Sequence, residues 1–243
     1  MTFNYDSDLL AAVSAAPTSI GDVIRTMEAI DRLCSAVDGL KWFNALYLDV
    51  TRAVAQRTAS QGFRDTAWLL RLDVCFAELY FGALRMALGG GRAAGCWRAL
   101  LDRRKNAAIA RIQFALAGVN AHINHDLPVA IGQACEGSGT SPLHGSTQYQ
   151  DYTSVNSTLD SLVDSAKQQL MVRLPGDALP PVSHVEDAVA SFSVCAAREA
   201  AWNNAEMLWA LRPVPPVRDR ALETLDGMTA FAGKALLAPV PIQ

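Results

Sequence analysis

Apolar residues recur along most of the chain at intervals of three and four positions, and the alternating pattern of a strand is nearly absent. Gly, Pro and Asp residues divide this pattern into helical segments. The expected helices cover about 18–37, 41–60, 64–88, 94–103, 106–134, 151–171, 185–211 and 217–237. This succession predicts one all-α domain, a bundle of seven or eight helices packed round a buried central pair.

The chain divides into a main domain and two short ends. We expect an N-terminal arm over 1–17, the all-helical domain over 18–238 and a C-terminal tail over 239–243. Pro17 ends the arm, and Ser19 can cap the first helix of the domain. The Gly-, Ser- and Thr-rich stretch 136–147 reads as a loop, and the proline-containing stretch 173–183 reads as an irregular connector.

Composition narrows the class of protein. Hydrophobic residues make up 51% of the chain and charged residues 19%, enough for a sizeable core. The net charge is −3, and the densest basic group, Arg98 to Lys105, is not accompanied by a nucleic-acid-binding motif. We therefore expect no nucleic-acid partner.

The location of the protein follows from its apolar runs and cysteines. Charged residues or histidines interrupt every apolar run short of the roughly 20 residues that a membrane span needs. The acidic N-terminal residues are unlike a signal peptide. Five widely spaced cysteines without a Cys-x-x-Cys pair fit free thiols in a reducing compartment. We expect a cytoplasmic protein without a membrane span.

The most informative segment runs from Phe114 to Pro128. Its first half is an apolar helix pattern, and its second half concentrates amide, imidazole and carboxylate groups. An imidazole or carboxylate removed from water needs a partner, so such groups on a buried helix indicate a prepared site. The polar residues are Asn120, His122, Asn124, His125 and Asp126.

Helical spacing divides these polar residues into two faces. Positions three and four apart share a face, so His122 is expected beside His125 and Asp126. Asn120 and Asn124 stack on a different face. The carboxylate of Asp126 could orient His122 for acid–base catalysis, or both residues could bind one metal ion. The third interpretation is a structural network at the end of a helix.

Two neighbours of the polar segment affect its geometry. Pro128 is expected to kink or end the helix just after Asp126, because proline disfavours the helical conformation before it. Gly118, one turn before His122, leaves room for a ligand or a neighbouring helix to approach closely.

Two further carboxylates, Asp49 and Asp73, lie in apolar surroundings. Each could form a structural salt bridge. Alternatively, both could converge with His122 and Asp126 from three helices, as the ligands of metal sites in helical bundles do. Two ligands on one helix do not complete a coordination sphere, and no Glu-x-x-His motif of di-iron bundles is present. No cofactor is certain from the sequence, and a divalent metal at these four residues is an alternative.

Aromatic and amide side chains at helical spacing are candidates for binding a substrate. The plain interpretation is core packing, but such residues also line apolar small-molecule pockets that contain a few polar groups. We assign this role to Trp42, Asn44, Tyr47, Asn120, Asn124 and Trp202.

Three segments resemble a bacterial and fungal family with a domain of unknown function. They are residues 42–51, 72–84 and 113–128, and the last contains the specific run Asn-Ala-His-Ile-Asn-His-Asp-Leu-Pro. The resemblance implies an all-α fold and carries no activity.

A weaker, local similarity is to helices of zinc-dependent phospholipases C and nucleases. These helices carry His-x-x-x-Asp pairs, one of them shortly before a proline, as His122, Asp126 and Pro128 do here. The N-terminal tryptophan ligand of that group is absent from this chain. His144 and His184 would have to supply the remaining ligands.

The sequence favours a small-molecule enzyme of isomerase or cyclase type that acts on a largely apolar metabolite. His122 would transfer protons, His125 would lie beside it, and Asp126 would orient the imidazole. Asp49 or Asp73 would be the opposing acid. A metal-dependent hydrolase and a non-enzymatic ligand-binding or scaffold protein are the alternatives. The oligomeric state is left open.

Overall fold

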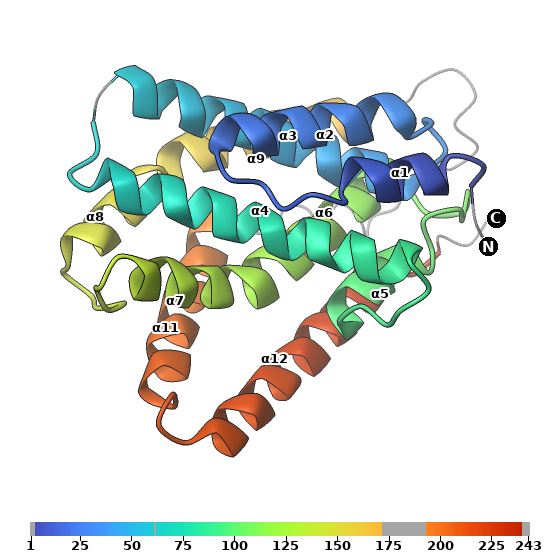
Figure 1. Ribbon diagram of the computed structural model, residues 1–243. Coiled ribbons are helices and arrows are strands. Elements are labelled where there is room, and N and C mark those ends of the chain that lie inside the picture. Colours follow the sequence, from blue (N-terminus) through green and yellow to red (C-terminus); the bar gives the residue numbers. More distant parts are fainter. Residues whose placement is uncertain (1–2, 61, 172–192, 240–243) are drawn as a thin grey trace.

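The computed structural model describes residues 3–60, 62–171 and 193–239, and all regular elements within these ranges are helices. They form one compact body, which confirms the prediction of an all-α domain (Figure 1). The elements are α1 (Asp6–Ala12), α2 (Ile20–Leu33), α3 (Gly39–Ser60), α4 (Thr66–Leu88), α5 (Gly95–Leu101), α6 (Arg111–Ala121), η1 (His122–Asp126), α7 (Leu127–Gly137), α8 (Thr147–Ser154), α9 (Asn156–Met171), α11 (Val194–Ala210) and α12 (Pro215–Leu236).

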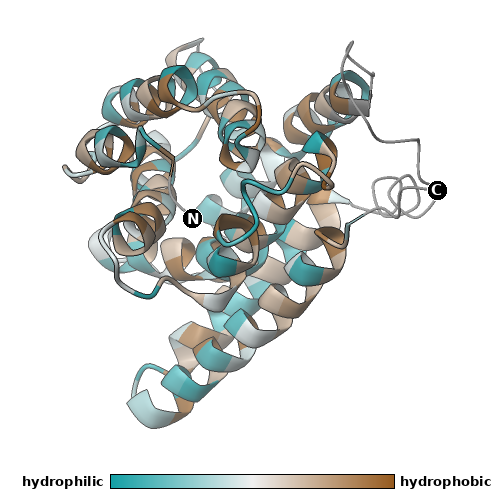
Figure 2. Cartoon of the chain, turned by 90° about the vertical axis from the view of Figure 1, so that its right-hand side faces the viewer, coloured by the Kyte–Doolittle hydropathy of each residue, from teal (hydrophilic) through white to brown (hydrophobic). Residues whose placement is uncertain are grey.

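Helix α6 lies at the centre of the molecule. All of its residues from Ile112 to Ala121 are buried, and helices α3 and α12 pack against it. Its continuation α7 packs against α4 and α11. Helices α11 and α12 diverge from their connection like the arms of a V (Figure 1). Most helices carry both hydrophobic and hydrophilic bands, as helices packed on one side do (Figure 2).

Two glycines let α3 and α6 approach closely. A Cβ atom on Gly118 would lie 2.3 Å from the Phe43 ring of α3, and one on Gly39 would lie 2.4 Å from the Phe114 ring of α6. Each glycine therefore receives an aromatic ring from the opposite helix. The space left by Gly118 is filled by a neighbouring helix.

The polar segment of the central helix is a single π-helical turn, η1. The backbone N–H of Leu127 donates to the carbonyl of His122, five residues earlier, and the helix continues into α7 without a break. In a regular α-helix the ring of Pro128 would clash with the carbonyl four residues before it. The wider π turn accommodates the proline, so the predicted kink or helix end after Asp126 is replaced by a change of helix type.

Several predicted boundaries are corrected. The expected N-terminal arm contains α1, whose Leu9 is fully buried. The helix expected over 151–171 is two helices, α8 and α9, and the central helix begins at Arg111. Some predictions concern residues outside the described ranges. They are the connector over 173–183, His184, the first residues of the helix predicted from 185, and residues 240–243 of the tail.

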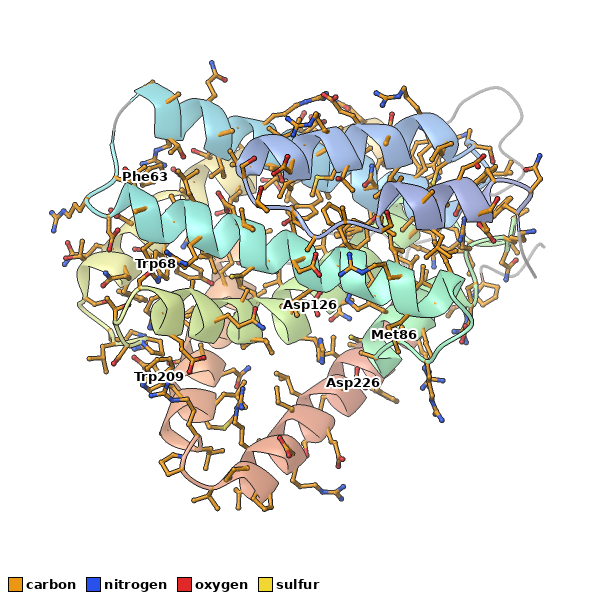
Figure 3. The ribbon with its side chains drawn as sticks, in the orientation of Figure 1. Phe63, Trp68, Met86, Asp126, Trp209 and Asp226 are labelled. Atoms are coloured by element: carbon orange, nitrogen blue, oxygen red, sulfur yellow. The ribbon has the colours of Figure 1, made fainter. Side chains whose placement is uncertain are left out.

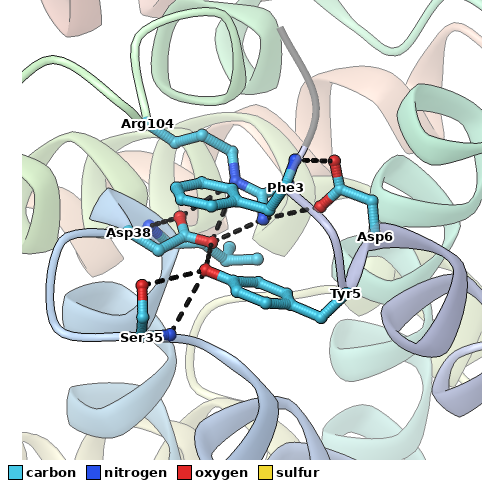
Figure 4. A network of polar contacts seen from close by, with 7 residues as sticks. Phe3, Tyr5, Asp6, Ser35, Asp38 and Arg104 are labelled. Atoms are coloured by element: carbon cyan, nitrogen blue, oxygen red, sulfur yellow. Dashed lines mark hydrogen bonds and ion pairs between the residues drawn. The ribbon is translucent and has the colours of Figure 1, made fainter.

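A buried ion-pair network fastens the N-terminal segment (Figure 4). Arg104 donates to both carboxylate oxygens of Asp38, with its Nε 2.9 Å from Oδ1, and also pairs with Asp6 of α1. Tyr5 donates to Asp38 as well, at 3.2 Å. Asp38 is fully buried and Arg104 is 5% exposed, so the charges depend on one another rather than on water.

Candidate active site

The centre of the candidate site is a hydrogen-bonded pair in the π turn. His122 Nδ1 lies 3.0 Å from Asp126 Oδ2, and both side chains are almost completely buried. A carboxylate only accepts hydrogen bonds, so Nδ1 carries the proton and Nε2 keeps its lone pair. Nε2 is buried and has no hydrogen-bond partner among the described residues. The pair therefore contains a basic nitrogen, His122 Nε2, whose lone pair is available to a bound molecule.

Three donors hold the Asp126 carboxylate. His122 and Trp97 donate to Oδ2, the latter from Nε1 at 2.9 Å, and His125 Nδ1 lies 2.7 Å from Oδ1. Burial raises the pKa of the Asp126 carboxyl, but the hydrogen bonds with the two histidines outweigh it, and the pKa lies below its usual value. Asp126 is thus an anion in the interior of the molecule, near its centre in Figure 3.

Aromatic rings surround the His122 imidazole. Phe76 stacks on it with ring centroids 3.5 Å apart, and the Tyr47 ring meets it edge-on at 4.4 Å. Burial lowers the pKa of His122, and Asp126 opposes this shift only in part. The resting imidazole is therefore neutral and ready to accept a proton.

A small, largely apolar pocket with a cavity volume of about 70 Å³ adjoins His122. This volume lies below the range of about 300–1,000 Å³ that is typical of sites for drug-sized ligands, so the pocket encloses only a small group or one end of a bound molecule. Helices α3, α4, α6, α9 and α11 and the π turn contribute to its wall. The lining residues are Phe43, Leu46, Tyr47, Val50, Phe76, Val119, His122, Ile123, Leu159, Val163, Val194 and Arg198.

Arg198 brings a fixed positive charge to this apolar wall. Its Nε donates to Asn156 Oδ1 at 2.8 Å, and its NH2 group donates to the Tyr152 carbonyl at 2.7 Å. The guanidinium also lies over the Tyr152 ring, 3.9 Å from its centroid. These contacts fix the orientation of a cation that is only 7% exposed.

Asp73 lies one helical turn before Phe76 on α4. Burial raises the pKa of its carboxyl to about 7, and the charge of Arg198 lowers it only in part. Its Oδ2 is buried and has no hydrogen-bond partner among the described residues. Burial, together with the charges of Asp73 and Asp126, raises the pKa of Tyr47. Asp73 thus acts electrostatically on two residues of the pocket wall.

Of the residues predicted to bind substrate, Tyr47 lines the pocket and several others have structural partners. Asn44 donates to the Met27 carbonyl, and Asn120 donates to the Thr229 carbonyl of α12, both at 2.9 Å. Asn124 donates to Asn120 Oδ1. Asn44 and Asn120 thus join helices, Asn124 bonds within the central helix, and none of the three amides lines the pocket.

The two predicted tryptophans also lie elsewhere. Trp42 packs under the guanidinium of Arg111, 4.8 Å from the centre of its ring. Trp202 is fully buried in a second hydrophobic cluster, edge-on to Trp68 and close to Tyr152. Neither tryptophan is among the residues that line the pocket beside His122.

The four-residue metal set predicted from the sequence does not assemble. The Asp49 side chain is 66% exposed and lies 3.7 Å from Arg52 on the outer side of α3. His122 and Asp126 bond to each other. His122 and His125 contact the two different oxygens of the Asp126 carboxylate.

Sequence reasoning missed most of the pocket wall. Phe76 was detectable in principle, because it follows Asp73 by one turn. Val163 and Val194 look like ordinary core residues, since nothing in the sequence tells which apolar residues face a cavity. Trp97 lies 29 positions from the carboxylate it contacts, and no local pattern connects them.

Comparison with known proteins places the chain in a family. Residues 20–239 match DUF5995, a family of unknown function. The chain belongs to this family. No curated protein and no solved structure matches the chain significantly. The DUF5995 match covers the central helix, the π turn and every pocket-lining residue.

Within the ranges that the structure describes, no helix combines the length and hydropathy that crossing a membrane requires.

Proposed function

We propose that this DUF5995 protein is a small-molecule enzyme that performs acid–base chemistry, of isomerase or cyclase type, on a largely apolar metabolite. One observation carries the proposal: His122 presents a buried, unpartnered Nε2 at the wall of an apolar pocket while Asp126 fixes its Nδ1. A histidine that served only packing would leave this nitrogen without compensation for its desolvation.

The chemistry follows from the state of the imidazole. Neutral His122 accepts a proton at Nε2 from an activated C–H or O–H group of the bound molecule. The resulting imidazolium is stabilised by the Asp126 carboxylate across the 3.0 Å hydrogen bond. The imidazolium, whose Nε2 proton exchanges with solvent, then delivers a proton to a different atom of the substrate, so the reaction consumes no external reagent and yields an isomer.

Arg198 in the pocket wall and Asp73 nearby on α4 are proposed to stabilise the charges that develop during the reaction. Arg198 would stabilise the oxyanion or enolate that forms when a proton leaves a carbon next to a carbonyl group. Asp73, whose pKa of about 7 leaves it partly protonated at neutrality, is the candidate for the opposing acid. The apolar wall excludes water, which strengthens each of these interactions.

The test is proton exchange with solvent. Apolar ketones and enones are first selected by the rise in melting temperature that they cause in the full chain. Each selected compound is then incubated with the protein in D₂O, and deuterium incorporation at carbon is followed by NMR. We expect His122→Gln to lower the exchange rate about 100-fold or more while the compound still binds.

A pocket-filling variant provides the matched control. Val163→Trp is expected to abolish both binding and exchange, because the larger ring fills the pocket while His122 and Asp126 are left unchanged in the sequence. If stabilising compounds bind but undergo no exchange, or if exchange is equal in wild type and His122→Gln, the protein is a ligand-binding module and the proposal fails.

A further inference from the structure

A second group of reactive side chains lies where the π turn meets α5 and α12. Cys96 of α5, His125 of the π turn and Asp226 of α12 bring together a thiol, an imidazole and a carboxylate. Their potential ligand atoms all lie within 4.8 Å of one another. Asp226 is seen on α12 beside α5 in Figure 3. Three separate elements thus converge on one point.

The imidazole of His125 is oriented for ligation. Its Nδ1 lies 2.7 Å from Asp126 Oδ1, so this nitrogen donates to the carboxylate and Nε2 keeps the free lone pair. Metal-binding histidines commonly use their second nitrogen for such a carboxylate contact, which fixes the tautomer and raises the basicity of the ligand. Asp126 in turn is held by Trp97.

The carboxylate of Asp226 is also fixed in place. It accepts hydrogen bonds from the backbone N–H groups of Gly95 and Cys96, each at 2.8 Å. A Cβ atom on Gly95 would lie 2.9 Å from Asp226 Oδ2, so any larger residue at this position would force the carboxylate to shift. Each carboxylate oxygen retains a lone pair for a further partner.

We propose that Cys96, His125 and Asp226 bind one divalent cation of the zinc type, with a fourth coordination position left for water or a small ligand. Thiolate and imidazole ligands select zinc-type ions over magnesium or calcium. The thiolate and carboxylate together neutralise a divalent charge. Tetrahedral zinc ligands lie about 3.3–3.8 Å apart, so small side-chain rotations suffice to close the site.

This site is separate from the proposed acid–base chemistry and shares only Asp126 with it. One carboxylate oxygen faces His122 and the other faces His125. Three protein ligands with one open position are the usual composition of a catalytic rather than a structural zinc site.

Cobalt substitution tests the proposal. Untagged full-length protein is treated with chelator, dialysed and titrated with Co²⁺. We expect one ion per chain, d–d bands of a tetrahedral ion and a thiolate-to-cobalt charge-transfer band. Cys96→Ser is expected to lose the charge-transfer band. Cys75→Ser, which changes a partly buried thiol outside the group, is expected to retain it.

Affinity and stability give an independent readout. Asp126→Asn is expected to weaken Zn²⁺ binding about 10- to 100-fold, because the partner that orients His125 is altered. Zn²⁺ is expected to raise the melting temperature of wild type and of His122→Gln equally, since His122 is not a ligand. The site and the proposed acid–base chemistry can therefore fail separately.

Two results with wild-type protein, and one with the variants, would overturn the proposal. If wild-type protein binds Co²⁺ without a thiolate charge-transfer band, or if Zn²⁺ at a large excess leaves the melting temperature unchanged, Cys96, His125 and Asp226 do not form a metal site. A charge-transfer band that persists in Cys96→Ser and disappears in Cys75→Ser leads to the same conclusion.

Discussion

Asp73 couples its protonation to folding. Its pKa is about 7 in the folded protein, against about 3.9 for an unperturbed aspartate. Between these values the folded chain binds more protons than the unfolded chain, so the stability contributed by this group is lost as the pH rises through the window from about 4 to 7. Part of the residue is exposed to solvent, which keeps the effect below the full value of the shift.

Replacing Asp73 with asparagine is expected to remove this pH dependence. Asp73→Asn should be more stable than wild type at pH 8, by up to about 1.4 kcal/mol for each unit of the pKa shift, and should gain least near pH 4. Urea denaturation at several pH values measures the difference. Asp49→Asn, which changes an exposed carboxylate, is the control and should stay within about 0.5 kcal/mol of wild type at every pH. A pH-independent gain for Asp73→Asn would contradict the assignment.

Single residues also show what a sequence can and cannot reveal. The spacing of His122 and Asp126 was enough to predict their contact, because it lies within one turn of helix. Asn44 and Asn120 were equally conspicuous, but their partners are backbone carbonyls of distant helices. A buried amide indicates that a hydrogen-bond partner exists, but it does not indicate whether that partner belongs to the protein or to a ligand.

Two glycines of the continuous central helix, Gly118 and Gly132, are expected to respond differently to substitution. Gly118 receives the Phe43 ring, whereas a Cβ atom on Gly132 of α7 would meet no atom within 4 Å. The two positions lie on the same continuous helix and differ in what packs on them. Alanine substitutions at these two positions therefore distinguish the cost of steric crowding from the general preference of helices for alanine.

We expect Gly118→Ala to destabilise the protein by about 1–3 kcal/mol, because the added methyl group collides with a ring in a closely packed interface. Gly132→Ala is expected to stabilise it by up to about 1 kcal/mol, since alanine is the better helix former. Thermal and urea unfolding measure both. Equal effects at the two positions would show that α3 and α6 are not in tight contact.

At the level of the elements, the sequence predicted most helices but not the π turn. Pro128 marked the position at which the regular helix must change. Whether the chain kinks, stops or widens there is decided by tertiary packing, because α7 can continue only if α4 and α11 accept its apolar face. Local pattern carries no information on those neighbours.

The whole molecule is held together by contacts between distant segments. Arg104 joins α1 and the corner before α3 through Asp6 and Asp38, and neither Arg104 nor Asp38 is appreciably exposed. Such a pair is costly to break, because the remaining charge has no access to water.

Arg104→Met is expected to lower the free energy of unfolding by about 3–5 kcal/mol, since it leaves Asp38 buried and unpaired. Combining it with Asp38→Asn should recover part of the loss, because a neutral amide does not require a counter-ion. Urea denaturation of the two single variants and the double variant measures this coupling. Strict additivity would mean that the two side chains contribute independently.

For the whole molecule, the fold class could be predicted from the sequence, but the contact between Cys96 and Asp226 could not. The helical period is a local property that each segment displays on its own. Cys96 and Asp226 are separated by 130 positions, and their meeting depends on how α12 crosses α5. Only the assembled molecule contains that information.

Helix α12 supplies partners to segments made much earlier in the chain. Its Thr229 carbonyl receives the Asn120 amide, the Leu236 carbonyl receives Gln113, and Asp226 receives the backbone N–H groups at the start of α5. During synthesis, α5 and α6 leave the ribosome long before these acceptors exist. Until α12 has been made, these polar groups of α5 and α6 lack their partners, so a chain that stops before Pro215 is expected to leave them unsatisfied and to be bound by chaperones.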